Sequence, residues 1–154
     1  MNAKITDRDR GYRRLIRRLL GPIAKGPGVT VGIHEQEGAA TPDGDVSIAT
    51  YATINEFGLG VPERSFLRST ADENAEDYGK AIERAILDDL EGGRSVVDGL
   101  DRVGMRAVRD VKRKIRDLKD PPNAPNTIAK KGSSNPLVDQ GAMRQAVTHR
   151  VVDV

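Results

Sequence analysis

The chain has 154 residues, of which 37% are hydrophobic and 31% charged, with no cysteine and a formal net charge of +2. This composition excludes a disulfide framework, a thiolate nucleophile and a sulfur-ligated metal, and the near balance of charges does not by itself favour nucleic-acid binding. The length predicts one domain over residues 1–154 with a thin core, and the lack of a long apolar run predicts a soluble protein, made in the cytoplasm, that has no membrane span.

The first predicted element is an amphipathic helix over residues 6–20, which ends at Gly21 and Pro22. One of its faces is an apolar stripe. The other face carries arginines, namely Arg8, Arg10, Arg13, Arg14, Arg17 and Arg18. We interpret this face either as a solvated helix surface or as a surface that contacts DNA or an acidic neighbouring subunit.

Two segments show the period-2 alternation of half-buried strands, residues 29–34 and residues 147–152, and we expect them to pair. The polar segment 36–45 is predicted to be a mobile loop. A short helix is expected to follow and to end at Gly58, because glycine suits a left-handed cap. We expect Phe57 to fold back against the core.

The central region predicts two long helices that a short glycine turn connects. The first runs from residue 70 to the glycines at 92 and 93, and its apolar stripe is Ala75, Tyr78, Ile82, Ile86 and Leu90. The second lies within residues 94–120, and its stripe is Val97, Leu100, Gly104, Val108, Val111, Ile115 and Leu118. Gly104 is expected to allow a close approach.

These elements predict an α+β fold, in which a small antiparallel sheet packs against two long helices and the N-terminal amphipathic helix, with extended loops. The segment 119–139 is rich in proline and lacks periodicity, so we interpret it as a second mobile, structureless loop. A helical turn is expected around residues 142–145, before the last strand.

No catalytic or metal site is indicated by the sequence. His34-Glu35 begins like a zinc helix motif, but Gly38 occupies the position of the second histidine. The acidic residues Asp88, Asp89 and Glu91 are expected to form a solvated helix face rather than a cation site. We therefore predict a protein that is not an enzyme and has no cofactor.

The segment from residue 54 to residue 70 concentrates scarce aromatic anchors. Phe66 and Leu67 lie between Arg64 and Arg68, after turn-forming glycines and Pro62. Apolar anchors flanked by arginines are typical of a surface that contacts a partner. Packing of Phe66 in the chain's own core is the alternative, because aromatic residues are few.

Three motifs follow one another along the chain: YATINEFG, then VPERSFLRSTADEN, then PPNAPNTIAKKGSSNPLVDQGAMRQAVTHRV. Together they resemble the tailed-bacteriophage neck and tail-completion family, the minor tail proteins that include the tail-completion protein Z type. The family's motifs fall on Tyr51-Ala52, Glu56-Phe57-Gly58, residues 62–67 and residues 136–143. Departures from the family pattern are Asn55, Leu59, Ser65 and Gln140.

The resemblance implies an α+β structural virion protein in the tail-neck region, which completes or terminates the tail and joins it to the head connector. It implies a homo-oligomeric ring, expected to be hexameric, whose lumen conducts DNA without sequence-specific binding. The tail-tube protein and a head connector or stopper protein are the implied partners. The expected interface residues are Phe57, Gly58, Pro62, Arg64, Phe66, Leu67, Arg68, Pro136, Leu137, Asp139 and Met143.

DNA must pass through such a neck without sticking, so we expect the arginine face mainly to meet solvent or acidic residues of adjacent subunits, with only minor contact with DNA. The residues of this electrostatic interface are Arg10, Arg13, Arg14, Arg17, Arg18, Asp88, Asp89 and Glu91. One alternative is a small DNA-binding or packaging accessory protein that uses the arginine-rich helix. Another is a hydrolase that uses His34 and the acidic residues.

Overall fold

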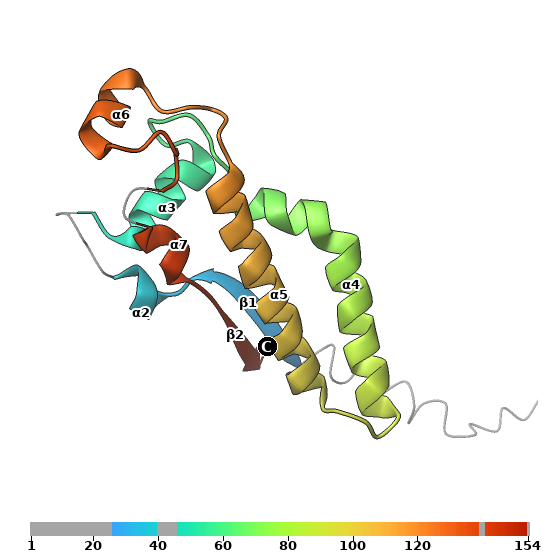
Figure 1. Cartoon of the computed structure of the whole chain (residues 1–154). Coiled ribbons are helices and arrows are strands. Elements are labelled where there is room, and N and C mark those ends of the chain that lie inside the picture. Colours follow the sequence, from blue (N-terminus) through green and yellow to red (C-terminus); the bar gives the residue numbers. More distant parts are fainter. Residues whose placement is uncertain (1–25, 40–45, 139–140, 154) are drawn as a thin grey trace, which may run out of the picture.

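The computed structural model describes residues 26–39, 46–138 and 141–153. Its elements are β1 (Pro27–Ile33), α2 (Glu35–Gly38), α3 (Ile48–Phe57), α4 (Arg68–Leu90), α5 (Val96–Asp117), α6 (Pro125–Lys131), α7 (Ala142–Ala146) and β2 (Val147–Asp153). The predicted α+β class is confirmed (Figure 1). The predicted N-terminal helix with its arginines lies outside the described residues, as does Asp139.

The sheet is an antiparallel pair of β1 and β2, as the alternating patterns predicted. Val29 pairs with Val151, and Val31 pairs with His149. Because side chains alternate along a strand, these four lie on one face of the pair, and α5 packs against that face. The first and last strands of the described chain therefore both pack against α5, a helix from the middle of the sequence.

α5 stands between the sheet and α4 (Figure 1). It contacts both strands, while α4 packs along it and is tied to it by polar pairs. Arg106 Nη2 lies 2.6 Å from Asp77 Oδ2, and the Tyr78 hydroxyl donates to Asp110 Oδ2 at 3.2 Å. The fold is therefore built in layers, with α5 as the central layer.

The buried stripes differ from the predicted ones at two positions. Val97 is 46% exposed, because it lies in the first turn of α5 at the end of the helix, and burial begins at Gly99 and Leu100. Ala75 is also exposed, whereas Ala85, further along α4, is buried. A β-carbon on Gly99 would lie 2.2 Å from Ala85 Cβ, so the two helices cross closely there.

Gly104 provides the predicted close approach. A β-carbon at this position would lie 2.3 Å from His149 Cδ2 and 2.9 Å from Val29 Cγ2. Gly104→Ala is therefore expected to lower the free energy of unfolding by about 1 to 3 kcal/mol, because the sheet would have to move away from α5. Denaturant unfolding followed by circular dichroism would measure the change.

Gly79 of α4 is the matched control, because a β-carbon there would meet nothing within 4 Å. Gly79→Ala is expected to raise the free energy of unfolding by about 0.5 to 1 kcal/mol, the ordinary helix preference of alanine over glycine. If both substitutions shift stability equally, the close contact of Gly104 with the sheet is contradicted.

Two predicted loops contain helices. The segment 119–139 is not structureless, because α6 begins with Pro125 in its first turn and ends at Gly132 with φ 67°. The proline start and glycine end are local helix signals, but seven residues are too few to show helical periodicity. The segment 36–45 likewise begins inside α2, and the rest of it lies largely outside the described residues.

The hydrophobic core gathers where α3, α5, α7 and β2 meet. Its buried residues are Ile48, Ala52, Phe66, Val111, Ile115, Leu137, Met143, Ala146 and Val147. Phe66 enters from the loop before α4, and Leu137 enters from the chain between α6 and α7. The loops that carry the family-like motifs are thus part of the core.

Candidate interaction surface

The carboxylate of Glu56, in the last turn of α3, holds the start of α4. Its Oε2 accepts hydrogen bonds from the backbone N–H of Phe66 at 2.8 Å and of Leu67 at 2.9 Å. Its Oε1 accepts from the N–H of Arg68 at 2.9 Å and from the Ser65 hydroxyl at 2.8 Å. One side chain therefore fixes both ends of the loop over residues 58–65.

These bonds use groups that a helix leaves free. The first N–H groups of a helix have no partner within it, and the positive end of its dipole favours an anion. Burial alone would raise the pKa of Glu56, but hydrogen bonds from the N–H groups of Leu67, Arg68 and Phe66 outweigh burial, and the pKa lies below its usual 4.5. The buried side chain therefore stays ionised at neutral pH.

Arg68 extends this connection to the surface. Its Nη2 donates to Glu63 Oε1 at 2.7 Å and to the carbonyl oxygen of Glu56 at 2.8 Å. Its guanidinium also lies 4.7 Å from the centre of the Phe57 ring, which is within cation–π range. Arg68 thus holds the exposed Phe57 in place.

Arg64 is buried and anchors the chain that leaves α5. Its Nε donates to the carbonyl oxygen of Pro121 at 2.8 Å, and its Nη2 donates to that of Pro122 at 2.9 Å. Nη1 lies 3.4 Å from Asn55 Oδ1 on α3. Arg64 therefore connects α3 to the proline-rich segment.

Five of the predicted interface residues have side chains that are buried within the single chain: Arg64, Phe66, Pro136, Leu137 and Met143. A side chain that is already surrounded by its own chain offers no surface to a partner. The alternative for Phe66, packing in the core, is the correct one, since its exposed fraction is 0%. Leu67 is half-buried against the same core.

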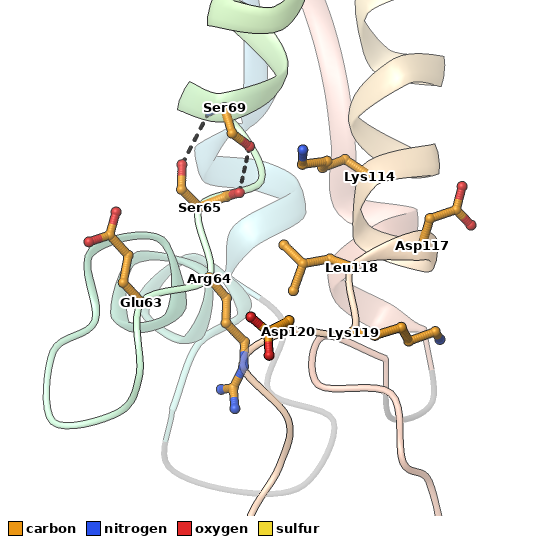
Figure 2. A pocket seen from close by; sticks show the side chains of 9 residues that line it. All are labelled: Glu63, Arg64, Ser65, Ser69, Lys114, Asp117, Leu118, Lys119 and Asp120. Carbon is orange, nitrogen blue, oxygen red and sulfur yellow. Dashed lines mark hydrogen bonds between the residues drawn. The ribbon is translucent and has the colours of Figure 1, made fainter.

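A shallow hollow of about 560 Å³ lies beside this anchored loop, between the start of α4 and the end of α5 (Figure 2). Within it, the Ser69 hydroxyl donates to the carbonyl oxygen of Ser65 at 2.6 Å. Its lining residues are Glu63, Arg64, Ser65, Ser69, Lys114, Asp117, Leu118, Lys119 and Asp120. Both signs of charge surround the hollow, so it does not select a cation or an anion.

Apolar side chains remain exposed just before α3, on α3 and in the loop after it. We name this set the α3 apolar surface, and its members are Val46, Tyr51, Phe57, Leu59 and Val61. Phe57 was expected to fold back against the core, and that prediction is wrong, because 53% of it is exposed and it lies beneath Arg68. Sequence reasoning missed Leu59 and Val61, although leucine and valine in a glycine-rich loop are a usable signal.

The loop after α3, which carries Leu59 and Val61, has a fixed conformation. Gly58 ends α3 with φ 67°, as predicted, and its N–H donates to the carbonyl oxygen of Ile54. A β-carbon on Gly58 would lie 3.0 Å from the backbone nitrogen of Glu63, so the turn is tight. Pro62 is exposed in the same loop. Leu59 and Val61 are therefore displayed on a loop of defined conformation.

The acidic residues at the end of α4 do not act alike. Asp88 Oδ2 accepts from the N–H of Arg94 at 3.3 Å, so this side chain supports the turn into α5. Asp89 and Glu91 are exposed. Within the described ranges, no group of three histidine or acidic side chains could hold a metal ion.

The two histidines lie on opposite faces of the sheet. His149 faces α5, with its Nε2 2.9 Å from Asp101 Oδ1. His34 lies on the other side, with its Nδ1 2.8 Å from the Thr148 hydroxyl oxygen. They therefore do not form one site.

No family model matches the chain, and neither the curated proteins nor the solved structures give a significant match. Among the helices that the structure describes, none is both long enough and apolar enough to span a membrane. The function of the chain therefore has to be inferred from its surfaces.

Proposed function

We propose that the chain is a non-enzymatic structural protein of a phage virion, which completes or terminates the tail and joins it to the head connector. In this role it is one subunit of a ring, expected to be hexameric, with a lumen through which DNA passes. Its further partners are the tail-tube protein and a connector or stopper protein.

The observation that carries the proposal is the pair of exposed apolar side chains on the anchored loop, Leu59 and Val61, next to the exposed Phe57. Exposed apolar side chains cost solvation unless a partner covers them, and a fixed loop loses little entropy on binding. Leu59 is 57% exposed, while Glu56 and Gly58 fix the loop at its base. Such a surface suits a permanent contact in an assembly better than it suits a substrate.

Light scattering of the purified chain, alone and mixed with its tail-tube or connector protein, tests the proposal. The expected result is a ring in at least one of these samples. Leu59→Ser is expected to weaken that assembly, whereas Val97→Ser, which changes an exposed valine outside the surface, is expected to leave it intact. A single-chain mass in every sample would overturn the proposal.

A second candidate function, DNA binding in packaging, is favoured by one observation. Arg109, Lys112, Arg113, Arg116 and Arg144 line one hollow on the exposed side of α5. Clustered basic side chains bind phosphate with a steep dependence on salt. Duplex DNA binding that weakens steeply with salt, in a chain that never forms rings, would favour this function.

A further inference from the structure

α6 projects from one end of the molecule, beyond α3 and the end of α5 (Figure 1). Among the described elements, it is the one helix that no other helix or strand packs against extensively. Asn126 and Ala129 of α6 are exposed, and so is Gly132 after it. The described part of the chain therefore leaves the surface of this helix largely uncovered.

A helix as short as α6 gains from a surface that covers it. Helices shorter than about 12 residues are marginal on their own in water, because forming the first turn costs conformational entropy that few hydrogen bonds offset. α6 has seven residues, and its N-cap Ala124 makes no side-chain hydrogen bond. Its local signals are only Pro125 in the first turn and Gly132 at the end. A contact with another surface would therefore stabilise α6.

The segment that carries α6 is fixed at its base. We name this segment, residues 121–136, the α6 arm. Arg64 holds its start, because its guanidinium donates to two proline carbonyl oxygens there at 2.8 and 2.9 Å. At the other end, the side-chain amide of Asn135 donates to the carbonyl oxygen of Arg116 at 2.8 Å. α6 is therefore presented in a set position, so the arm loses little entropy on docking.

A second uncovered surface lies at the opposite end of the molecule (Figure 1). It is the second half of α4, residues 81–91, where Leu87 is 49% exposed. Of the 23 residues of α4, only Thr70 and Ala85 are buried. Residues 81–91 contain four acidic residues and one basic residue, whereas α6 contains two lysines and no acidic residue. This surface therefore combines an exposed apolar side chain with a net charge opposite to that of α6.

We infer that the α6 arm of one copy docks on the second half of α4 of a second copy. This inference rests on the proposed function, because it identifies a contact that joins neighbouring subunits. The arm and the surface that receives it are different surfaces at opposite ends of the chain, so the contact is head-to-tail, and its repetition closes a ring or extends a filament. A second copy is favoured over a different protein because each copy brings both surfaces in equal number.

Two full-length variants each remove one side of this contact. In the arm variant, glycine and serine residues of equal number replace residues 125–131, which removes α6 and keeps the base of the arm. In the second variant, Leu87→Arg, a basic side chain faces the lysines of α6. Each variant alone is expected to assemble at least about tenfold more weakly than the original chain. Light scattering over a concentration series measures the loss, and the single chains should unfold at a nearly unchanged denaturant concentration.

Mixing the two variants gives the decisive result. The Leu87→Arg chain retains an intact arm, and the arm variant retains an intact α4, so one contact forms between them and the pair cannot extend. The expected product is a one-to-one complex with the mass of two copies, and its formation also shows that both variants are folded. Met105→Arg is the matched control, because Met105 is 50% exposed on α5, outside both surfaces, and this variant should assemble as the original chain does.

The outcomes separate this inference from the proposed function. If both variants form rings as the original chain does, the docking contact is wrong and the ring stands. The docking contact is also wrong if the mixture yields no two-copy complex, if Met105→Arg loses assembly as Leu87→Arg does, or if the arm variant unfolds at a clearly lower denaturant concentration. If the arm variant fails only to bind the tail-tube or connector protein, the arm belongs to that contact and the inference is wrong. If the original chain stays a single copy with and without those proteins, both proposals fail.

Discussion

Glu56→Gln is expected to lower the free energy of unfolding by about 2 to 3 kcal/mol at neutral pH, because hydrogen bonds to a charged acceptor are worth more than those to a neutral one. The carboxylate accepts from three consecutive backbone N–H groups at the start of α4, and only 3% of Glu56 is exposed. An amide of the same shape has one oxygen and one NH2 group, so its nitrogen would face donors. Denaturant unfolding measures the loss.

The same residue predicts how stability depends on pH. The pKa of Glu56 lies below its usual 4.5 in the folded chain, so the folded state binds this proton less tightly than the unfolded chain does. The stabilisation is therefore complete above pH 4.5 and declines as the pH falls through the folded value. The stability difference between the original chain and Glu56→Gln should be largest at neutral pH and shrink in acid.

Glu63→Gln is the matched control. Glu63 also pairs with Arg68, at 2.7 Å, but its side chain is 56% exposed. An exposed pair contributes only about 0 to 1 kcal/mol, so this substitution should have little effect at any pH. Equal losses for the two substitutions would contradict the role of the buried carboxylate.

The regular elements could be predicted from the sequence because their causes are local. The two strands follow from alternation, the long helices from apolar spacing, and the end of α3 from Gly58. The close approach at Gly104 was also predictable, because a glycine within the apolar stripe of a helix leaves room for a neighbouring element. Ser95 adds a local cap, because its side chain accepts from the N–H of Asp98.

The site could be predicted only in part, because its contacts join residues that no local pattern links. Glu56 reads as an ordinary polar residue of a short helix, and only the tertiary fold brings the start of α4 to it. From the sequence alone, Arg64 would be placed on the surface beside an aromatic residue. In the structure it is buried, and it donates hydrogen bonds to carbonyl oxygens more than fifty residues later in the chain. The sequence marked residues 54–70 as a contact segment, but in the structure Arg64 and Phe66 are buried, whereas Leu59 and Val61 are exposed.

Phe66→Ala is expected to lower the free energy of unfolding by about 3 to 5 kcal/mol, the usual cost of deleting a buried aromatic ring. Phe66 has an exposed fraction of 0% and belongs to the core cluster with Ile115 and Leu137. Calorimetry or denaturant unfolding of the purified chain measures this loss, and a change below about 1 kcal/mol would contradict the burial of the ring.

Phe57, the only other phenylalanine of the chain, is expected to give the opposite pattern. Phe57→Ala should lower the free energy of unfolding of the single chain by about 0.5 to 1 kcal/mol, because it removes the cation–π contact between the ring and Arg68, whose guanidinium lies 4.7 Å from the ring centre. If the α3 apolar surface joins the assembly, the same substitution should weaken ring formation, because the exposed ring is then buried by a neighbour. Light scattering and unfolding on the same samples separate the two effects. Unchanged assembly in Phe57→Ala and Leu59→Ser would remove the α3 apolar surface from the interface, since those two side chains are its most exposed members.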